Sequence, residues 1–130
     1  MVKILTTLSK SFWKRIEFGK SKLMSSGENA NVKFWCVWMM KTIIRCGFEI
    51  VIEKEREYTR DLYLCTKTFG KYYPSKKNDM EIVLELAINP ISDSSKILRS
   101  MLDFAKWLDK EIILILSPDE ISHEVISRKY

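Results

Sequence analysis

The sequence predicts an α/β fold of the α+β kind, in which a mixed sheet and several helices form a single domain over residues 1–130. Hydrophobic residues make up 46% of the chain, and its length suffices to bury a core without disulfide bonds. Three segments alternate apolar and polar side chains, as half-buried strands do. A helical pattern and an unbroken apolar run follow them. We therefore expect two N-terminal helices, an antiparallel three-strand meander and a final strand–helix–strand unit.

The two N-terminal helices are expected over residues 2–18 and Asn31–Cys46. Apolar side chains recur every four residues in the first helix, and Gly19 is expected to end it. The second helix is apolar around most of its circumference, which predicts burial, and Gly47 stands where a C-cap glycine belongs. A short first strand over Met1–Leu5 remains an alternative for the beginning of the chain.

The meander is expected to comprise Phe48–Glu53, Asp61–Lys67 and Glu81–Ile88, each of which alternates apolar and polar residues. Gly70 to Asp79 contains Pro74 and several lysines, and we interpret it as a basic loop. The short connections favour antiparallel pairing of the three strands.

The final unit begins after Pro90, which ends the third strand. Ser92 and Asp93 are good N-cap residues for a helix over residues 93–109, the clearest amphipathic pattern in the chain. Ile112–Leu116 is apolar throughout, as is typical of a strand buried on both faces. A right-handed crossover should place this strand parallel to the third strand of the meander.

The net charge of +5 lies in residues 1–22, since the rest of the chain sums to zero. A basic end on a neutral body predicts contact with nucleic acid, an acidic protein or a membrane surface, the alternative being a solvated helix face. Phe34, Trp35 and Trp38 have the chemistry to stack on bases. We favour core packing for these rings because no basic residue stands between Phe34 and Met40.

The cysteines and the single histidine exclude some kinds of site. Cys36, Cys46 and Cys65 have neither disulfide-framework nor metal-ligand spacing, which predicts buried thiols and a cytoplasmic location. His123 alone leaves little for a histidine-based metal site, so we expect no metal. The most apolar run, Phe34–Met40, is shorter than the roughly 20 residues of a membrane span, so we expect no membrane insertion.

The order of these elements resembles the GCN5-related N-acetyltransferase (GNAT) fold over nearly the whole chain. The resemblance implies that the strands Glu81–Ile88 and Ile112–Leu116 splay apart and hold acetyl-CoA between them. It further implies cofactor-binding positions at Leu86, Ile88, Ser94, Ser95 and Lys96. The loop at 89–96 lacks the glycines of the family's pyrophosphate-binding pattern.

In the same family a carboxylate often acts as the base, and a tyrosine often protonates the leaving thiolate. The resemblance implies these roles for Glu85, or Glu81, and for Tyr130. The family continues with further strands where this sequence stops, which implies a truncated or degenerate relative that keeps the fold with or without the activity. The expected function is therefore acetyl-CoA-dependent N-acetyl transfer. The alternative is a non-catalytic binding or inhibitor protein of the phage or plasmid accessory type, which uses residues 1–22 or the lysines at 71–77.

The strand Ile112–Leu116 would present an unpaired edge if no later strand covered it. Such an edge templates pairing with another chain. We therefore expect the edge to form a homodimer or to bind a protein partner.

Overall fold

The computed structural model describes residues 11–55 and 57–115, and in this part of the chain it contains helices and no strand. The α/β prediction is therefore wrong, and the protein is a helical bundle. Its helices are α2 (Phe12–Ser25), α3 (Asn29–Glu49), α4 (Ile52–Glu55), α5 (Leu62–Tyr72), the 3₁₀ turn η2 (Pro74–Lys76), α6 (Lys77–Ile88) and α7 (Ser94–Ile115).

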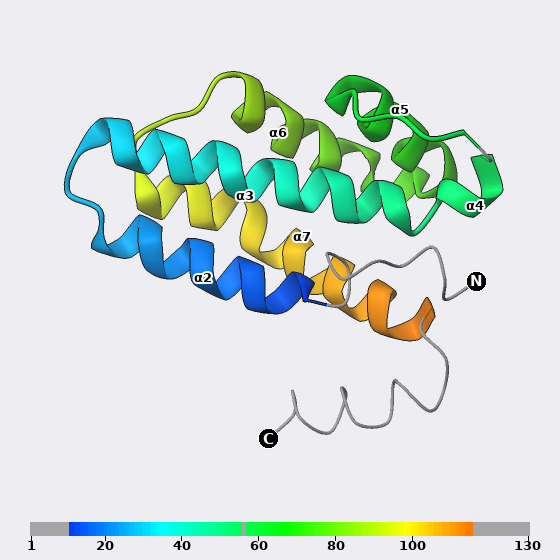
Figure 1. Ribbon diagram of the computed structural model, residues 1–130, viewed down its shortest axis with the longest axis horizontal. Helices are drawn as coiled ribbons and strands as arrows, with labels where there is room; N and C mark the ends of the chain where they lie inside the picture. The colour runs from blue at the N-terminus through cyan, green and yellow to red at the C-terminus, as the bar shows by residue number, and fades with distance from the viewer. Residues whose placement is uncertain (1–10, 56, 116–130) are drawn as a thin grey trace.

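Four of these helices, α2, α3, α6 and α7, alternate in direction as in an up-and-down bundle (Figure 1). Helix α3 is central because it contacts α2, α5, α6 and α7. Helix α5 packs against both α3 and α6, and α2 and α7 complete the bundle on the other side of α3. One hydrophobic cluster extends through all of these helices.

The segment Glu81–Ile88 illustrates why the strand prediction failed. It lies in α6, where the buried residues are Met80, Val83, Leu86 and Ala87. Their spacing of three or four residues is that of a helix face. The alternating pattern was coincidental, because Ile82 and Ile88 are 40% and 60% exposed. The segment also contains several residues that favour helices, including leucine and glutamate.

The other two meander strands are also helical or turn segments. Phe48–Glu53 contains the end of α3, a turn and the start of α4. Asp61–Lys67 belongs to the start of α5, where the Asp61 side chain accepts a hydrogen bond from the Leu64 N–H and caps the helix. The expected loop from Gly70 to Asp79 is mostly helical as well.

The apolar run that began at Ile112 continues α7 and does not form a strand. No glycine or proline interrupts the chain between Ser94 and Ile115, so nothing ends the helix after residue 109. The predicted strand edge is therefore absent over residues 112–115, so the expectation of a homodimer or protein partner through that edge loses its structural basis. The expected N-cap is confirmed, because Asp93 accepts a hydrogen bond from the Lys96 N–H.

The helix predicted over Asn31–Cys46 is confirmed and is longer than expected. Gly47 does not end it; this residue lies inside α3 and allows Phe69 and Met80 to approach the backbone. Of the helix expected over residues 2–18, the described part begins α2 at Phe12, and residues 1–10, with the alternative strand Met1–Leu5, lie outside the described residues.

Gly19 was expected to end the first helix but lies within α2, against α3. A Cβ atom at this position would overlap Met39 Cγ and lie 2.8 Å from Met39 Sδ. Met39 is fully buried, so it has little room to move away. The absence of a side chain at Gly19 is therefore what allows α2 and α3 to pack this closely.

We expect Gly19→Ala to lower the free energy of unfolding by about 1–2 kcal/mol, because overpacking outweighs the gain in helix propensity. Chemical denaturation measures this change. Gly27→Ala is the matched control, since a Cβ there meets nothing within 4 Å. Equal stability of the two variants would contradict the close contact between α2 and α3.

A basic and aromatic candidate site on helices α2 and α3

The residues predicted for acetyl transfer do not form a common site in the bundle. Glu85 is exposed on α6 and accepts a hydrogen bond from the Asn89 side chain, whereas Leu86 on the same helix is buried. Ile88 is 60% exposed at the end of α6. Tyr130 lies outside the described residues.

The predicted pyrophosphate site at the start of α7 is an ordinary capped helix terminus. The Ser94 hydroxyl donates to the Leu23 carbonyl, and the Lys96 N–H donates to the Asp93 carboxylate. Ser95 is exposed beside them. The splayed strand pair on which the GNAT resemblance rested is absent from residues 11–55 and 57–115, so the acetyltransferase assignment has no structural support. Binding of acetyl-CoA stays an untested prediction.

The positive charge of the described chain is concentrated in α2 and α3. Between residues 11 and 49, seven lysine or arginine residues stand against three glutamates, whereas nine of each sign cancel between residues 57 and 115. The two helices lie side by side, so these charges share one layer of the bundle (Figure 1). A polyanion would be attracted to this layer more than to the rest of the described molecule.

Four aromatic rings form a cluster on this layer, which we call the ring cluster: Phe18 of α2 with Phe34, Trp35 and Trp38 of α3. Adjacent rings meet edge to face, with centroid separations of 5.0 Å for Phe34–Trp35 and 5.5 Å for Trp35–Trp38. Phe18 closes the cluster at 5.6 Å from Trp35 and 5.9 Å from Trp38. Phe18 is 49% and Phe34 is 59% exposed, so the cluster is an apolar surface feature.

Lys22 places a positive charge directly on the ring cluster. Its Nζ lies 5.3 Å from the centroid of the Phe18 ring and 5.9 Å from that of Trp35. These are cation–π distances. The sequence analysis favoured core packing for these rings because no basic residue interleaves with them locally, and Trp35 and Trp38 do pack, half-buried, against the hydrophobic core. The fold supplies a basic residue from the neighbouring helix.

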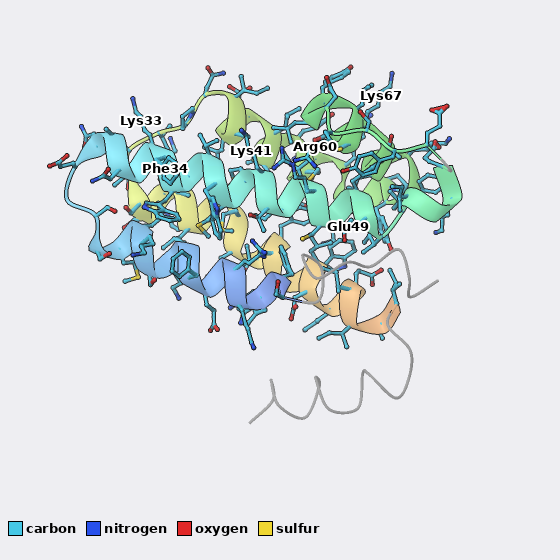
Figure 2. All side chains as sticks on the ribbon, viewed as in Figure 1. Lys33, Phe34, Lys41, Glu49, Arg60 and Lys67 are labelled. Atoms are coloured by element: carbon cyan, nitrogen blue, oxygen red, sulfur yellow. The ribbon has the colours of Figure 1, made fainter. Side chains whose placement is uncertain are left out.

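Residues of α3 extend the ring cluster along the helix. Phe34, Trp38, Lys41 and Arg45 are spaced by four, three and four residues, which places them on one stripe of the helix. Figure 2 shows Phe34 on the side of α3 that faces α2, with Lys41 farther along the same helix. The stripe therefore runs from exposed rings to two basic side chains.

The lysines near residues 71–77 form a second basic region, but several of them have partners within the protein. Lys71 forms an ion pair with Glu55 at 2.9 Å, which lowers the pKa of the Glu55 carboxyl and raises the pKa of the Lys71 ammonium. Lys71 also lies over the Tyr72 ring, and Lys76 lies over the Trp107 ring. These contacts make this region a weaker candidate for an external anion than the ring cluster.

The three cysteines are buried and form no disulfide bond, which confirms the expectation of buried thiols. Burial raises the pKa of Cys36, and it raises the pKa of Cys65 to about 11. The described residues contain no group of three histidine, cysteine, aspartate or glutamate side chains placed to hold a metal ion. None of the described helices is long and apolar enough to cross a membrane.

No protein-family model, no curated protein and no solved structure matches this chain. The candidate site therefore rests on the geometry of α2 and α3.

We expect Phe34→Ala to lower the free energy of unfolding by less than about 1 kcal/mol, because much of the ring is already in water. Phe69→Ala is the matched control, and this fully buried ring should cost about 3–5 kcal/mol when truncated. Urea unfolding of both variants tests the difference. A large loss at Phe34 would mean that the ring supports the fold and is not an exposed binding group.

The raised pKa of Cys65 predicts a pH dependence of stability. The folded thiol has a pKa of about 11 against an ordinary value of 9.0, so its contribution is complete below pH 9 and is lost as the pH rises to about 11. We expect the stability difference between the wild type and Cys65→Ala to shrink by about 2–3 kcal/mol over this interval.

Urea unfolding under reducing conditions at several pH values measures this difference. Burial and a hydrogen bond to Glu111 raise the pKa of Tyr73 to about 12, but Tyr73 is present in both proteins and its effect cancels. A constant difference between pH 9 and 11 would contradict the buried, neutral state of the Cys65 thiol.

Proposed function

We propose that this protein is a non-catalytic binding protein that holds single-stranded nucleic acid on helices α2 and α3. The observation that carries the proposal is the ring cluster with Lys22 across it, in the layer that holds the positive charge. Proteins that bind single strands combine these two features, because bases stack on aromatic rings while basic side chains neutralise phosphates.

The stripe on α3 fits a single strand better than a duplex. Phe34 and Arg45 are eleven residues apart, which corresponds to about 16 Å along a helix. This length accommodates a short run of nucleotides with bases near Phe34 and phosphates near Lys41 and Arg45. A duplex would keep its base faces stacked and hidden from the rings, so the exposed rings favour unpaired bases.

The proposed setting is the cytoplasm, where three buried thiols without disulfide bonds are expected. In this proposal the protein acts by binding alone, and its affinity depends on stacking of bases and on attraction between charges. Sequence preference among oligonucleotides should be modest, since every base has a face that can stack.

We expect an unstructured oligonucleotide such as oligo(dT) or oligo(U) to bind and to quench tryptophan fluorescence through Trp35 and Trp38. Phe34→Ala should weaken binding by roughly 5- to 150-fold, which corresponds to about 1–3 kcal/mol per stacked base. Lys22→Met should lower the slope of log affinity against log salt by about 0.7, the value for one phosphate contact on a single strand. Fluorescence anisotropy over a salt series measures both effects.

Lys67→Met is the matched control, because it removes one exposed lysine from α5, which packs away from α2. It should leave the tryptophan quenching unchanged and alter the affinity little. A polyglutamate peptide tests the alternative that the partner is an acidic protein. If the peptide binds through Lys22 and Phe34 while oligonucleotides do not bind, the partner is an acidic protein and the nucleic-acid proposal is wrong.

A further inference from the structure

A second feature lies at the other end of the α3 stripe, where α3 meets the segment that leads into α5. A pocket of about 220 Å³ is lined there by Arg45, Phe48, Glu49, Tyr58, Thr59, Arg60 and Cys65. One water occupies about 30 Å³ in the liquid, so this volume accommodates a small polyatomic anion. Figure 2 labels Arg60 beside α3 and Glu49 at the end of α3.

Arg45 lines this pocket, and part of its guanidinium group is buried. Its Nε is inaccessible to solvent and has no hydrogen-bond partner among the described residues. A buried donor without an acceptor costs about 1–3 kcal/mol, and more in a charged group. Because Arg45 also lines the pocket, its guanidinium charge favours an anionic ligand there.

Arg60 brings a second guanidinium group to the same pocket. Both guanidinium groups act to lower the pKa of the Cys65 thiol, although burial has the larger effect and raises that pKa to about 11. The charges of both arginines, which come from different segments of the chain, therefore reach the Cys65 thiol. Two guanidinium groups, one half-buried at Arg45 and one exposed at Arg60, suit an anion with several oxygens.

Two hydroxyl groups add donors beside the arginines. The Tyr58 hydroxyl accepts a hydrogen bond from Arg60 Nη1 at 3.3 Å, and Thr59 Oγ1 accepts one from the Asp61 N–H at 3.1 Å. Each oxygen therefore acts as an acceptor toward the protein, and its hydroxyl proton is available to an incoming acceptor. The pocket thus presents more donors than the two oxygens of a carboxylate can use.

Two carboxylates oppose an anion in this position. Asp61 accepts a hydrogen bond from the Leu64 N–H as the cap of α5, and Glu49 lines the pocket. A dianion with several oxygens that contacts both arginines directly gains more than a monoanion does, because each guanidinium group then faces a charged oxygen.

We propose that this pocket binds a phosphate group, as inorganic phosphate or as the terminal phosphate of a monoester. Arg45 and Arg60 donate to its oxygens from two sides, and the Tyr58 and Thr59 hydroxyls complete the contacts.

The test uses inorganic phosphate with the full chain at constant ionic strength, with chloride as the reference anion. Phosphate should raise the melting temperature and give a saturable heat of binding, because a ligand that binds only the folded form stabilises it. Arg45→Met and Arg60→Met should each weaken binding tenfold or more. Arg99→Met, which removes an exposed arginine on α7, is the matched control and should bind as the wild type does.

Arg45→Met should fold at least as well as the wild type without phosphate, because it removes the unpartnered buried group. The proposal is overturned if phosphate produces neither shift nor heat, or if its binding is insensitive to both arginine substitutions.

A comparison of 5′-phosphorylated with unphosphorylated oligonucleotide distinguishes the two sources of phosphate. Tighter binding of the phosphorylated strand, lost in Arg45→Met, assigns the pocket to a nucleic-acid terminus. Binding of inorganic phosphate with no difference between the two strands assigns it to a free phosphate compound. If inorganic phosphate binds and no oligonucleotide does, the pocket stands and the proposed nucleic-acid function fails, so the two proposals are separable.

Discussion

The burial of helix α3 is the constraint on which the rest of the structure depends. Its neighbours α2, α5, α6 and α7 all pack against it, and residues on most of its circumference are buried. Gly19 of α2 and Gly47 of α3 lie at two of these contacts, where a side chain would collide with a methionine. A helix enclosed in this way has one direction left open to solvent. Trp38, Lys41 and Arg45 remain partly exposed and lie on one stripe of α3, which connects the ring cluster with the pocket that Arg45 lines.

The helix predictions were correct where the helical period extended over a long segment. The strand predictions were wrong where they rested on a short apolar or alternating segment. Asn31–Cys46 and residues 93–109 are helical as expected, since each is long enough to show a helical period. Glu81–Ile88 is too short for its alternation to exclude a helix, and only the bundle reveals that Val83 and Leu86 face the core. The run after residue 109 contains no breaker, so it continues the helix, with Ile112 and Ile113 buried and Leu114 70% exposed.

The candidate site was harder to predict from the sequence than the helices were, because its contacts join residues that are far apart in the chain. The basic N-terminal region was recognised, and its described part does lie on α2. The pairing of Lys22 with Trp35 depends on how two helices pack, and thirteen residues separate them in the chain. Arg45 and Arg60 likewise stand fifteen residues apart and line a common pocket only after α3 and α5 have docked. Local interleaving of charges and rings cannot reveal contacts of this kind.

Lys22 has a role both in the free protein, where it lies over the rings, and in the proposed complex, where it would contact a phosphate. Exposed aromatic rings add little to stability and favour association with other apolar surfaces. The Lys22 side chain covers part of that surface, and its charge keeps the face hydrated. A base that stacks on Phe34 would leave the ammonium close enough to turn toward a phosphate. In the proposed complex the same lysine would contribute to affinity, and binding would require a change of its side-chain rotamer and no rearrangement of the helices.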